Sequence, residues 1–335
     1  MRYPLQVSFL FLVVLSSTLA GGCATRQAPQ PTLRLGDYQK LLERQKAGMS
    51  VADETPQKLP EMTIEEYEIA GDNYLLQNNL PMAFVQYDKA LRMAPTARVL
   101  RYKKGMIFLR KGLAREALRE FQDVLKTDDT FALAYEGSGQ AFLLLGDMRA
   151  AEQQLQRAIA LDASLWKSHN FLGMIYDQQQ RFDDAIAAYK TALTLKRDDG
   201  ALFNNFGMSH YRQGDYANAL RAFEKAVDMG YVDAKVYNNL GLALAKLGRY
   251  QEALIAFTKG SDPAKAHNNL GVIYFTAGQY KEALAAFEKA IELSPRYYPT
   301  ASENLRLAQQ ALRAVPPSAQ MFIMPAGEKN AQAAR

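Results

Sequence analysis

The chain has 335 residues, of which 48% are hydrophobic and 22% charged, a composition within the ordinary range of globular proteins with a sizeable core. Its net charge of +5 comes from 40 basic and 35 acidic residues spread along the sequence without a block of Lys and Arg, which argues against nucleic-acid binding. The only cysteine, Cys23, excludes an intramolecular disulfide and a metal site built from a cysteine cluster.

Residues 1–22 have the layout of a secretory signal peptide: a basic residue near the start, an apolar run over residues 7–15, then small residues. The run is too short for a membrane-spanning helix, which needs about 20 residues. The stretch Leu19–Cys23 (LAGGC) resembles a bacterial lipobox, which implies cleavage before Cys23 and lipidation of its thiol. Because Ala24 stands where an aspartate would indicate inner-membrane retention, we expect an anchor at the periplasmic face of the outer membrane. The alternative is a secreted protein with a chance cysteine at the cleavage site.

Residues 23–60 are expected to form a lipidated, flexible tether. Prolines lie among Gln, Thr and Lys residues, and apolar periodicity is weak apart from a short helix expected near residues 38–45. As a coil, this linker has an end-to-end distance of roughly 35 Å, so the body of the protein reaches away from the membrane. At the other end, residues 314–335 are rich in Ala, Pro and Gln and are expected to be a disordered tail.

The segment between these ends repeats with a period of 34 residues. Glycine recurs in steps of 34, with a last step of 30: Gly71, Gly105, Gly139, Gly173, Gly207, Gly241 and Gly271. Twelve residues after each glycine stands an alanine: Ala83, Ala117, Ala151, Ala185, Ala219, Ala253 and Ala283. Four residues later comes an aromatic residue or leucine: Tyr87, Phe121, Leu155, Tyr189, Phe223, Phe257 and Phe287.

These residues resemble the tetratricopeptide repeat, whose signature has small residues at positions 8, 20 and 27 and an aromatic residue at position 24. The resemblance implies an all-α fold, a right-handed superhelical solenoid of seven helix-turn-helix repeats over residues 61–313. The repeats would span 64–97, 98–131, 132–165, 166–199, 200–233, 234–263 and 264–297, followed by a capping helix at 298–313.

Each repeat contains two stretches with apolar residues at i, i+3, i+4 and i+7, separated by a turn such as Gly146-Asp147. We expect the small residues at positions 8 and 20 to face each other, so that the helix axes approach to about 8–10 Å. Repeat six lacks four residues, and the segment from Lys259 to Pro263 should end its second helix early and change the superhelical pitch locally.

Few residues of the sequence are candidates for a catalytic or metal-binding site. His169 and His267 stand at position 4 and His210 at position 11, which are packing positions, and none has a second ligand at metal-binding spacing on its own helix. No glycine-rich phosphate loop following a strand is expected. We therefore predict a protein that is not an enzyme, with no cofactor, no metal site and no small-molecule substrate.

A polar pattern on the first helices of repeats four to seven is the candidate binding site. It has lysines at position 2 and asparagines at positions 5 and 6: Lys167, Lys235, Lys265, Asn170, Asn204, Asn205, Asn238, Asn239, Asn268 and Asn269. The position-6 asparagines resemble those of the repeat domain in O-linked N-acetylglucosamine transferases, which implies that they hold the backbone of an extended peptide in a concave groove. An amide both donates and accepts hydrogen bonds, and the lysines would favour an acidic segment. The alternative is that these amides brace neighbouring helices.

The first three repeats lack this pattern. At the positions of the carboxylate clamp of chaperone-binding repeats they carry Glu68, Asp72, Tyr102 and Met106, so recognition of a free C-terminus is not expected. Leucines face the groove or the stacking surface instead: Leu75, Leu76, Leu109, Leu143 and Leu144. We predict that this half binds an apolar segment and the other half an extended polar one.

The predicted function is a scaffold for a protein or peptide partner. Size, lipobox and repeat number resemble the repeat lipoprotein of the tight-adherence (Flp) pilus assembly machinery and, less closely, the pilotins of type IV pili. That resemblance implies a secretin or another pilus-assembly component as partner. The alternative is a periplasmic adaptor that recruits proteases or cell-wall hydrolases.

Overall fold

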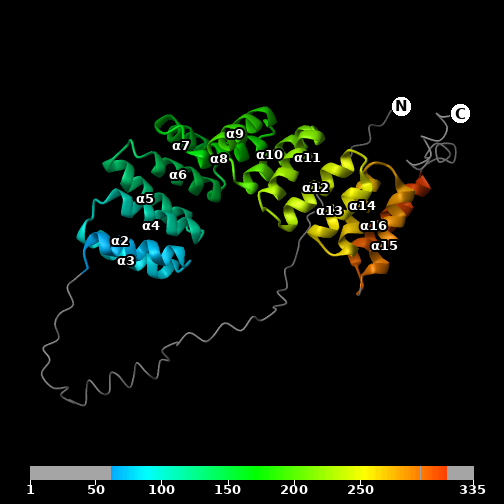
Figure 1. Cartoon of the computed structure of the whole chain (residues 1–335), viewed down its shortest axis with the longest axis horizontal. Helices are drawn as coiled ribbons and strands as arrows, with labels where there is room; N and C mark the ends of the chain where they lie inside the picture. Colours follow the sequence, from blue (N-terminus) through cyan, green and yellow to red (C-terminus); the bar gives the residue numbers. More distant parts are fainter. Residues whose placement is uncertain (1–61, 295, 315–335) are drawn as a thin grey trace, which may run out of the picture. The chain divides into compact units, whose positions relative to one another are not determined.

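The computed structural model describes residues 62–294 and 296–314 (Figure 1). Fifteen α-helices and no strand occupy these residues. The predicted signal peptide, the lipobox with Cys23, the tether and the tail beyond residue 314 lie outside the described residues. No helix in the described ranges has both the length and the hydropathy to cross a membrane.

The helices form seven pairs and a final single helix. The first members, here called A helices, are α2 (Ile64–Leu76), α4 (Arg98–Arg110), α6 (Ala132–Leu145), α8 (Trp166–Gln178), α10 (Gly200–Gln213), α12 (Ala234–Lys246) and α14 (Pro263–Thr276). The second members, here called B helices, are α3 (Leu80–Met93), α5 (Ala114–Thr127), α7 (Met148–Leu161), α9 (Phe182–Leu195), α11 (Tyr216–Asp228), α13 (Tyr250–Gly260) and α15 (Tyr280–Leu293). The last helix is α16 (Pro299–Ala314).

The pairs stack in chain order from α2 to α16 (Figure 1). Each A helix packs on the B helix after it, and each B helix packs on the next A helix. Successive A helices also touch, at α4–α6, α6–α8, α8–α10 and α10–α12, and α14 touches α16. A stack whose elements approach more closely on one side curves toward that side, so the A helices form the inner face. The predicted all-α superhelical solenoid is confirmed.

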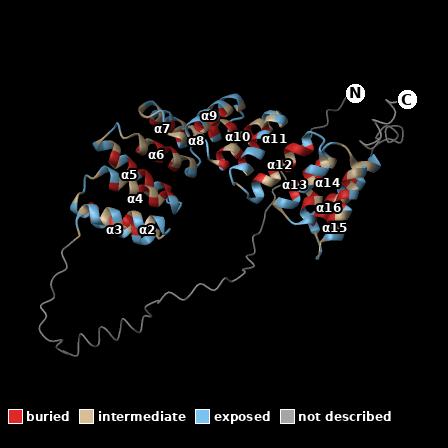
Figure 2. Cartoon of the chain, in the orientation of Figure 1, coloured by how far each residue is buried: buried red, intermediate tan, exposed pale blue. Residues whose placement is uncertain are grey.

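The helices form because their apolar residues recur on one face. In α5, Ala117, Phe121 and Val124 are fully buried, whereas Arg115 and Arg119 on the opposite face are exposed. Figure 2 shows the same division along the stack, with buried residues on the sides of the helices that face their neighbours. A single pair cannot cover this apolar face by itself, so each pair depends on the next for its core.

The repeated glycine packs closely against the position-24 side chain, which is an aromatic ring in six repeats and Leu155 in the third. A methyl group added to Gly71 would lie 2.3 Å from the Tyr87 ring, and one added to Gly173 would lie 2.7 Å from the Tyr189 ring. The position-20 alanines are fully buried beside this contact, as at Ala83. The pairing of positions 8 and 20 stays a prediction, and the structure adds that the position-24 side chain fills the space that the missing side chain leaves.

The turns within the pairs also follow from the sequence. Gly146 ends α6 with φ of 79°, in the left-handed region that favours glycine. Asp147 then begins α7, and its Oδ1 accepts a hydrogen bond from the Ala150 N–H at 2.9 Å. Gly214 and Asp215 do the same between α10 and α11.

The shortened sixth repeat ends its B helix early, as predicted. Helix α13 has 11 residues, whereas α11 has 13 and α15 has 14. It ends at Gly260, where an added methyl group would lie 2.9 Å from the carbonyl oxygen of Ala234 in the first turn of α12. Asp262 and Pro263 then begin α14 directly.

Candidate peptide-binding face

Three side-chain hydrogen bonds join asparagines one repeat apart, two of them between A helices and one between α14 and α16, and we call them amide bridges. In each, Nδ2 of the later residue donates to Oδ1 of the earlier one: Asn205 to Asn170 at 3.2 Å, Asn239 to Asn204 at 2.8 Å, and Asn304 to Asn268 at 2.9 Å. The partners lie 35 or 36 residues apart, so each bridge spans one repeat. The bridges join α8 to α10, α10 to α12 and α14 to α16.

Most of the bridging amides are buried. Asn204 is 1% exposed, Asn268 7% and Asn239 8%. A buried amide without a partner costs about 1–3 kcal/mol, so these bonds fix the register between A helices. At these positions the amides brace neighbouring helices, which was the alternative interpretation of the asparagine pattern.

The bridge between α8 and α10 is more open. Asn170 and Asn205 are half-buried, and within the described part of the chain the only other hydrogen bond of the Asn170 amide is a weak one from Nδ2 to Met174 Sδ at 4.0 Å. Among the described residues, the side-chain carbonyl oxygen of Asn205 has no hydrogen-bond partner. This bridge therefore presents both an acceptor and a donor on the inner face.

No amide bridge joins α12 and α14 within the described residues. The register would pair Asn238 with Asn269, but the shortened sixth repeat lies between them. Oδ1 of Asn238 is instead buried without a hydrogen-bond partner, and it lies 3.3 Å from the space that a side chain on Gly260 would fill. Asn269 is half-buried and carries no side-chain hydrogen bond to another described residue.

The three predicted lysines are all exposed at the start of their A helices. Lys167 lies over the adjacent Trp166 ring at 5.7 Å, and Lys235 has no ion pair in the described chain. Lys265 pairs with Asp262 at 2.9 Å, and its pKa is raised because that carboxylate hydrogen-bonds to the ammonium. Lys167 and Lys235 are thus the lysines that remain available to an acidic partner.

A row of apolar side chains lies one helical turn after the position-5 asparagines, and sequence reasoning missed it. Met174 is 44% exposed, and the other members are half-buried: Met208, Leu242 and Val272. Each stands four residues after an asparagine of the predicted site, so the same register would have located the row. We call these four residues the apolar row.

The A helices of this half carry almost no negative charge. The only carboxylate on α8, α10, α12 and α14 is Asp177, which is 7% exposed and accepts a hydrogen bond from the Tyr189 hydroxyl at 3.1 Å. Burial raises the pKa of Asp177. The basic residues on the same helices are Lys167, Arg212, Lys235, Lys246 and Lys265.

In the first half of the solenoid, charged side chains stand at the repeat positions that the bridging asparagines occupy in the second half. Lys103 on α4 lies 35 residues after Glu68 on α2, the spacing of an amide bridge, and its Nζ donates to Glu68 Oε1 at 2.6 Å. It also donates to Asp72 at 2.8 Å, and the Tyr87 hydroxyl donates to the same carboxylate at 2.6 Å. Burial opposes the charged form of Lys103, but the hydrogen bonds to the two carboxylates raise its pKa above the ordinary value.

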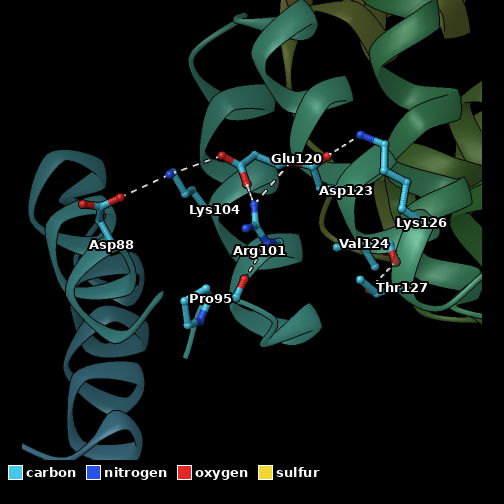
Figure 3. Close-up of polar contacts among 9 residues, drawn as sticks. All are labelled: Asp88, Pro95, Arg101, Lys104, Glu120, Asp123, Val124, Lys126 and Thr127. Carbon is cyan, nitrogen blue, oxygen red and sulfur yellow. Dashed lines mark hydrogen bonds and ion pairs between the residues drawn. The ribbon is translucent and has the colours of Figure 1, made fainter. Parts of the chain in front are cut away.

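A second ion-pair network joins α3, α4 and α5 (Figure 3). Lys104 lies 3.2 Å from both Asp88 on α3 and Glu120 on α5. Arg101 reaches Glu120 and Asp123 at 3.4 Å and also donates to the carbonyl oxygen of Pro95 at 3.0 Å. The first repeats are therefore held together by charges on several sides.

The leucines of the first half divide between core and surface. Leu109 is 6% exposed and lies in one core cluster with Phe121 and with Ala134 of the next repeat, so of the two predicted positions it takes the stacking surface and not the groove. Leu76 and Leu144 are 87% and 55% exposed, whereas Leu75 and Leu143 are half-buried. An apolar partner would meet Leu76 or Leu144 and not Leu109.

The histidines take part in packing. His210 stacks edge-on against Phe206 at 4.6 Å, and burial lowers the pKa of His210 and His267. The Nε2 of His169 lies 3.2 Å from the carbonyl oxygen of Ala163. Across the described residues, no cluster of three or more His, Cys, Asp and Glu side chains is arranged to hold a metal ion.

A solenoid of helix pairs with a polar, register-matched inner face defines the class of helical-repeat proteins that bind other proteins. The family model "Cilia and flagella-associated protein 70 C-terminal domain" matches residues 14–268, and the model "Tetratricopeptide repeat" matches residues 264–297. The chain therefore belongs to the tetratricopeptide-repeat family that the first of these models describes.

Two known proteins and one solved structure are similar to part of this chain. DnaJ homolog subfamily C member 7 of Mus musculus is 30% identical over 98 residues, which cover 29% of this chain and 20% of that protein. Heat shock protein STI1 of Saccharomyces cerevisiae is 27% identical over 120 residues, 33% of this chain and 20% of that one. The matched segments thus cover only a fifth of each relative. The structure described as "Crystal structure of APC/C hetero-tetramer Cut9-Hcn1" is similar with a TM-score of 0.53 at 22% identity, over 73% of this chain and 48% of that chain, which concerns the fold alone.

Proposed function

We propose that the inner face of α8, α10, α12 and α14 binds an extended segment of a partner protein, so that the chain acts as a non-enzymatic scaffold. The observation that carries the proposal is the half-buried amide bridge between Asn170 and Asn205, in which the Asn205 carbonyl oxygen has no hydrogen-bond partner among the described residues. An extended peptide backbone offers the complementary carbonyl and N–H groups. Lys167 and Lys235 lie exposed on α8 and α12, two of the same helices.

The proposal includes a cellular location for the chain. Residues 19–23 resemble a lipobox, and we propose that Cys23 carries lipid and holds the solenoid at the periplasmic face of the outer membrane. There the chain would recruit a component of a pilus or secretion machine, such as a secretin, in keeping with the resemblance to the tight-adherence pilus lipoprotein. Recruitment of a protease or cell-wall hydrolase is the competing role for the same face.

The test is photocrosslinking in cells with a light-activated residue in place of Lys235. This side chain is exposed and makes no ion pair in the described chain, so the probe leaves the amide bridges intact. The matched control places the probe at Ile255, which is 59% exposed on the B helix α13. A partner captured at position 235, and lost when Asn170 and Asn205 are replaced by alanine, supports the groove. Capture only from position 255 contradicts it.

The identity of the captured protein separates the two roles. A secretin or pilus-assembly subunit supports the machine-assembly role, whereas a peptidase or wall hydrolase supports the adaptor role and leaves the binding face unchanged. Metabolic labelling with a palmitate analogue tests the anchor: label should enter the wild-type chain and be absent from the Cys23→Ser variant. Label that persists in that variant would contradict lipidation at Cys23.

A further inference from the structure

The exposed charged residues within the A helices of the second half are basic. On α8, α10, α12 and α14 the single carboxylate, Asp177, is buried, while Lys235 and Lys246 are exposed. Helix α2, by contrast, carries Glu65, Glu66, Glu68 and Asp72 and no basic residue. Asp199, Asp233 and Asp262 cap the first turns of α10, α12 and α14, and Asp262 pairs with Lys265. Beyond these caps, a segment that lies along the four helices meets exposed basic residues and no exposed carboxylate.

The apolar row gives this basic face a second property. Met174, Met208, Leu242 and Val272 occur once per A helix, next to the asparagines and between the lysines near one helix end and Arg212 or Lys246 near the other. Met174 is 44% exposed, whereas Met208, Leu242 and Val272 are half-buried, with one side packed against the core and the remainder accessible. A partner can bury apolar side chains on this row while its carboxylates meet the basic residues on both sides.

The repeat sets the spacing of those side chains. Neighbouring helices that pack directly have axes about 8–10 Å apart, and successive A helices are in contact along most of the stack. An extended chain advances about 3.3 Å per residue. One repeat therefore corresponds to about three residues of an extended partner.

We propose that the partner segment is acidic and extended, with an apolar side chain at about every third residue that fills one position of the apolar row. This inference rests on the proposed function and specifies the charge and the residue pattern of the partner segment. The three positions on α8, α10 and α12, whose helices are in direct contact, require a segment of about seven residues. The amide bridges hold the peptide backbone, the apolar row sets its register, and the basic residues select its charge.

The experiment is a binding titration of the full chain with three fluorescein-labelled synthetic peptides of equal length, followed by fluorescence anisotropy. The first peptide has leucine at every third position among Asp, Glu and Ser. The second has the same composition, with the same number of leucines grouped at a spacing of two residues, and the third keeps the period of three but replaces Asp and Glu with Lys. We expect the first peptide to bind at least about tenfold more tightly than either of the others, a difference of about 1.4 kcal/mol.

Variants assign the effect to the inner face. Met174→Ser should weaken binding of the first peptide about tenfold or less, because it removes one apolar contact from an already exposed position. The Lys235→Glu and Lys246→Glu pair should weaken it further and more strongly at low salt. The matched controls Ile255→Ser and Lys259→Glu lie on the B helix α13 and should leave binding unchanged. Emission of the single tryptophan, Trp166, verifies that each variant is folded.

The outcomes are separable from those of the crosslinking test. Equal binding of the first two peptides overturns the period of three, and equal or tighter binding of the lysine peptide overturns the charge. No peptide binding together with capture at position 235 overturns this inference and leaves the scaffold function standing. Capture only from position 255 overturns the proposed function itself.

Discussion

In the two halves of the solenoid, different side-chain interactions join successive A helices: ion pairs in the first half and hydrogen bonds between amides in the second. Between α2 and α4 the inner face is joined by an ion pair, Lys103 with Glu68, and α3, α4 and α5 share the network in Figure 3. Between α8 and α12 the same register is joined by neutral amides. Charges used within the chain are satisfied by their own partners, whereas amides that donate only one of their bonds keep capacity for a ligand. The comparison explains why the second half is the better candidate for a binding face.

The largest expected effect lies in the core, where the halves should not differ. Gly105→Val in the first half and Gly241→Val in the second both place a side chain within 2.5 Å of a buried ring, Phe121 or Phe257. Each variant should lose about 3 kcal/mol of stability, because the ring cannot move without overpacking. Urea unfolding followed by far-ultraviolet circular dichroism measures the loss.

The control for this pair is Ala187→Val on the exposed face of α9, which should change stability by less than about 0.5 kcal/mol. Unequal losses at Gly105 and Gly241 would show that the halves differ in core packing and not only in their inner faces. Equal losses leave the comparison confined to the polar contacts.

The next effect separates the halves. Asn239→Ala should cost about 1–3 kcal/mol, because the buried Oδ1 of Asn204 then loses its partner. Adding Asn204→Ala should cost less than the sum of the two single changes, since the unsatisfied group is removed with its partner. Asn269→Ala, which breaks no side-chain bond to a described residue, serves as the control and should be close to neutral. A fully additive double variant would mean that the bridge contributes nothing.

The fold of the solenoid could be predicted from the sequence, but some of its side-chain contacts could not. The fold follows from the 34-residue period, since small and aromatic residues at fixed positions leave helix pairs as the one regular way to pack. The close contact of Gly71 with the Tyr87 ring was not predicted, because Ala83 and Tyr87 both face the A helix and the axial offset of the two helices decides how closely each approaches the glycine.

The asparagines show the same limit. Residues 204 and 205 are adjacent, and so are 238 and 239, and neighbours on a helix differ by about 100° in direction. Position 5 is the buried member in the first pair, but position 6 is buried in the second. That difference depends on how far each A helix is rotated against the next. Asn304 was missed altogether, because α16 follows a segment that breaks the register of the repeat.

A smaller effect tests the ionic half. Lys103→Met should lower stability by about 1 kcal/mol or less, because Lys103, Glu68 and Asp72 are partly exposed and water screens their attraction. The loss should shrink as sodium chloride is raised, since salt weakens the wild-type ion pair. The loss caused by Asn239→Ala should not change with salt, because no charge is removed. Salt-independent losses at both sites would remove the chemical distinction between the halves.

The smallest effect concerns Glu136, which lies at the junction of the halves and accepts a hydrogen bond from Ser168 on α8 at 2.8 Å. Burial raises the pKa of this carboxyl above its ordinary value of 4.5. The folded state therefore holds the proton more tightly than the unfolded chain, so the stabilisation is fully present below pH 4.5 and is lost as the pH rises through the raised pKa. A glutamine at this position has no such proton to lose, so Glu136→Gln should be the more stable protein at neutral pH and lose that advantage near pH 4.5. Thermal unfolding midpoints of both proteins across this pH range measure the difference, and an advantage that grows on acidification would show that Glu136 is stabilised in its charged form.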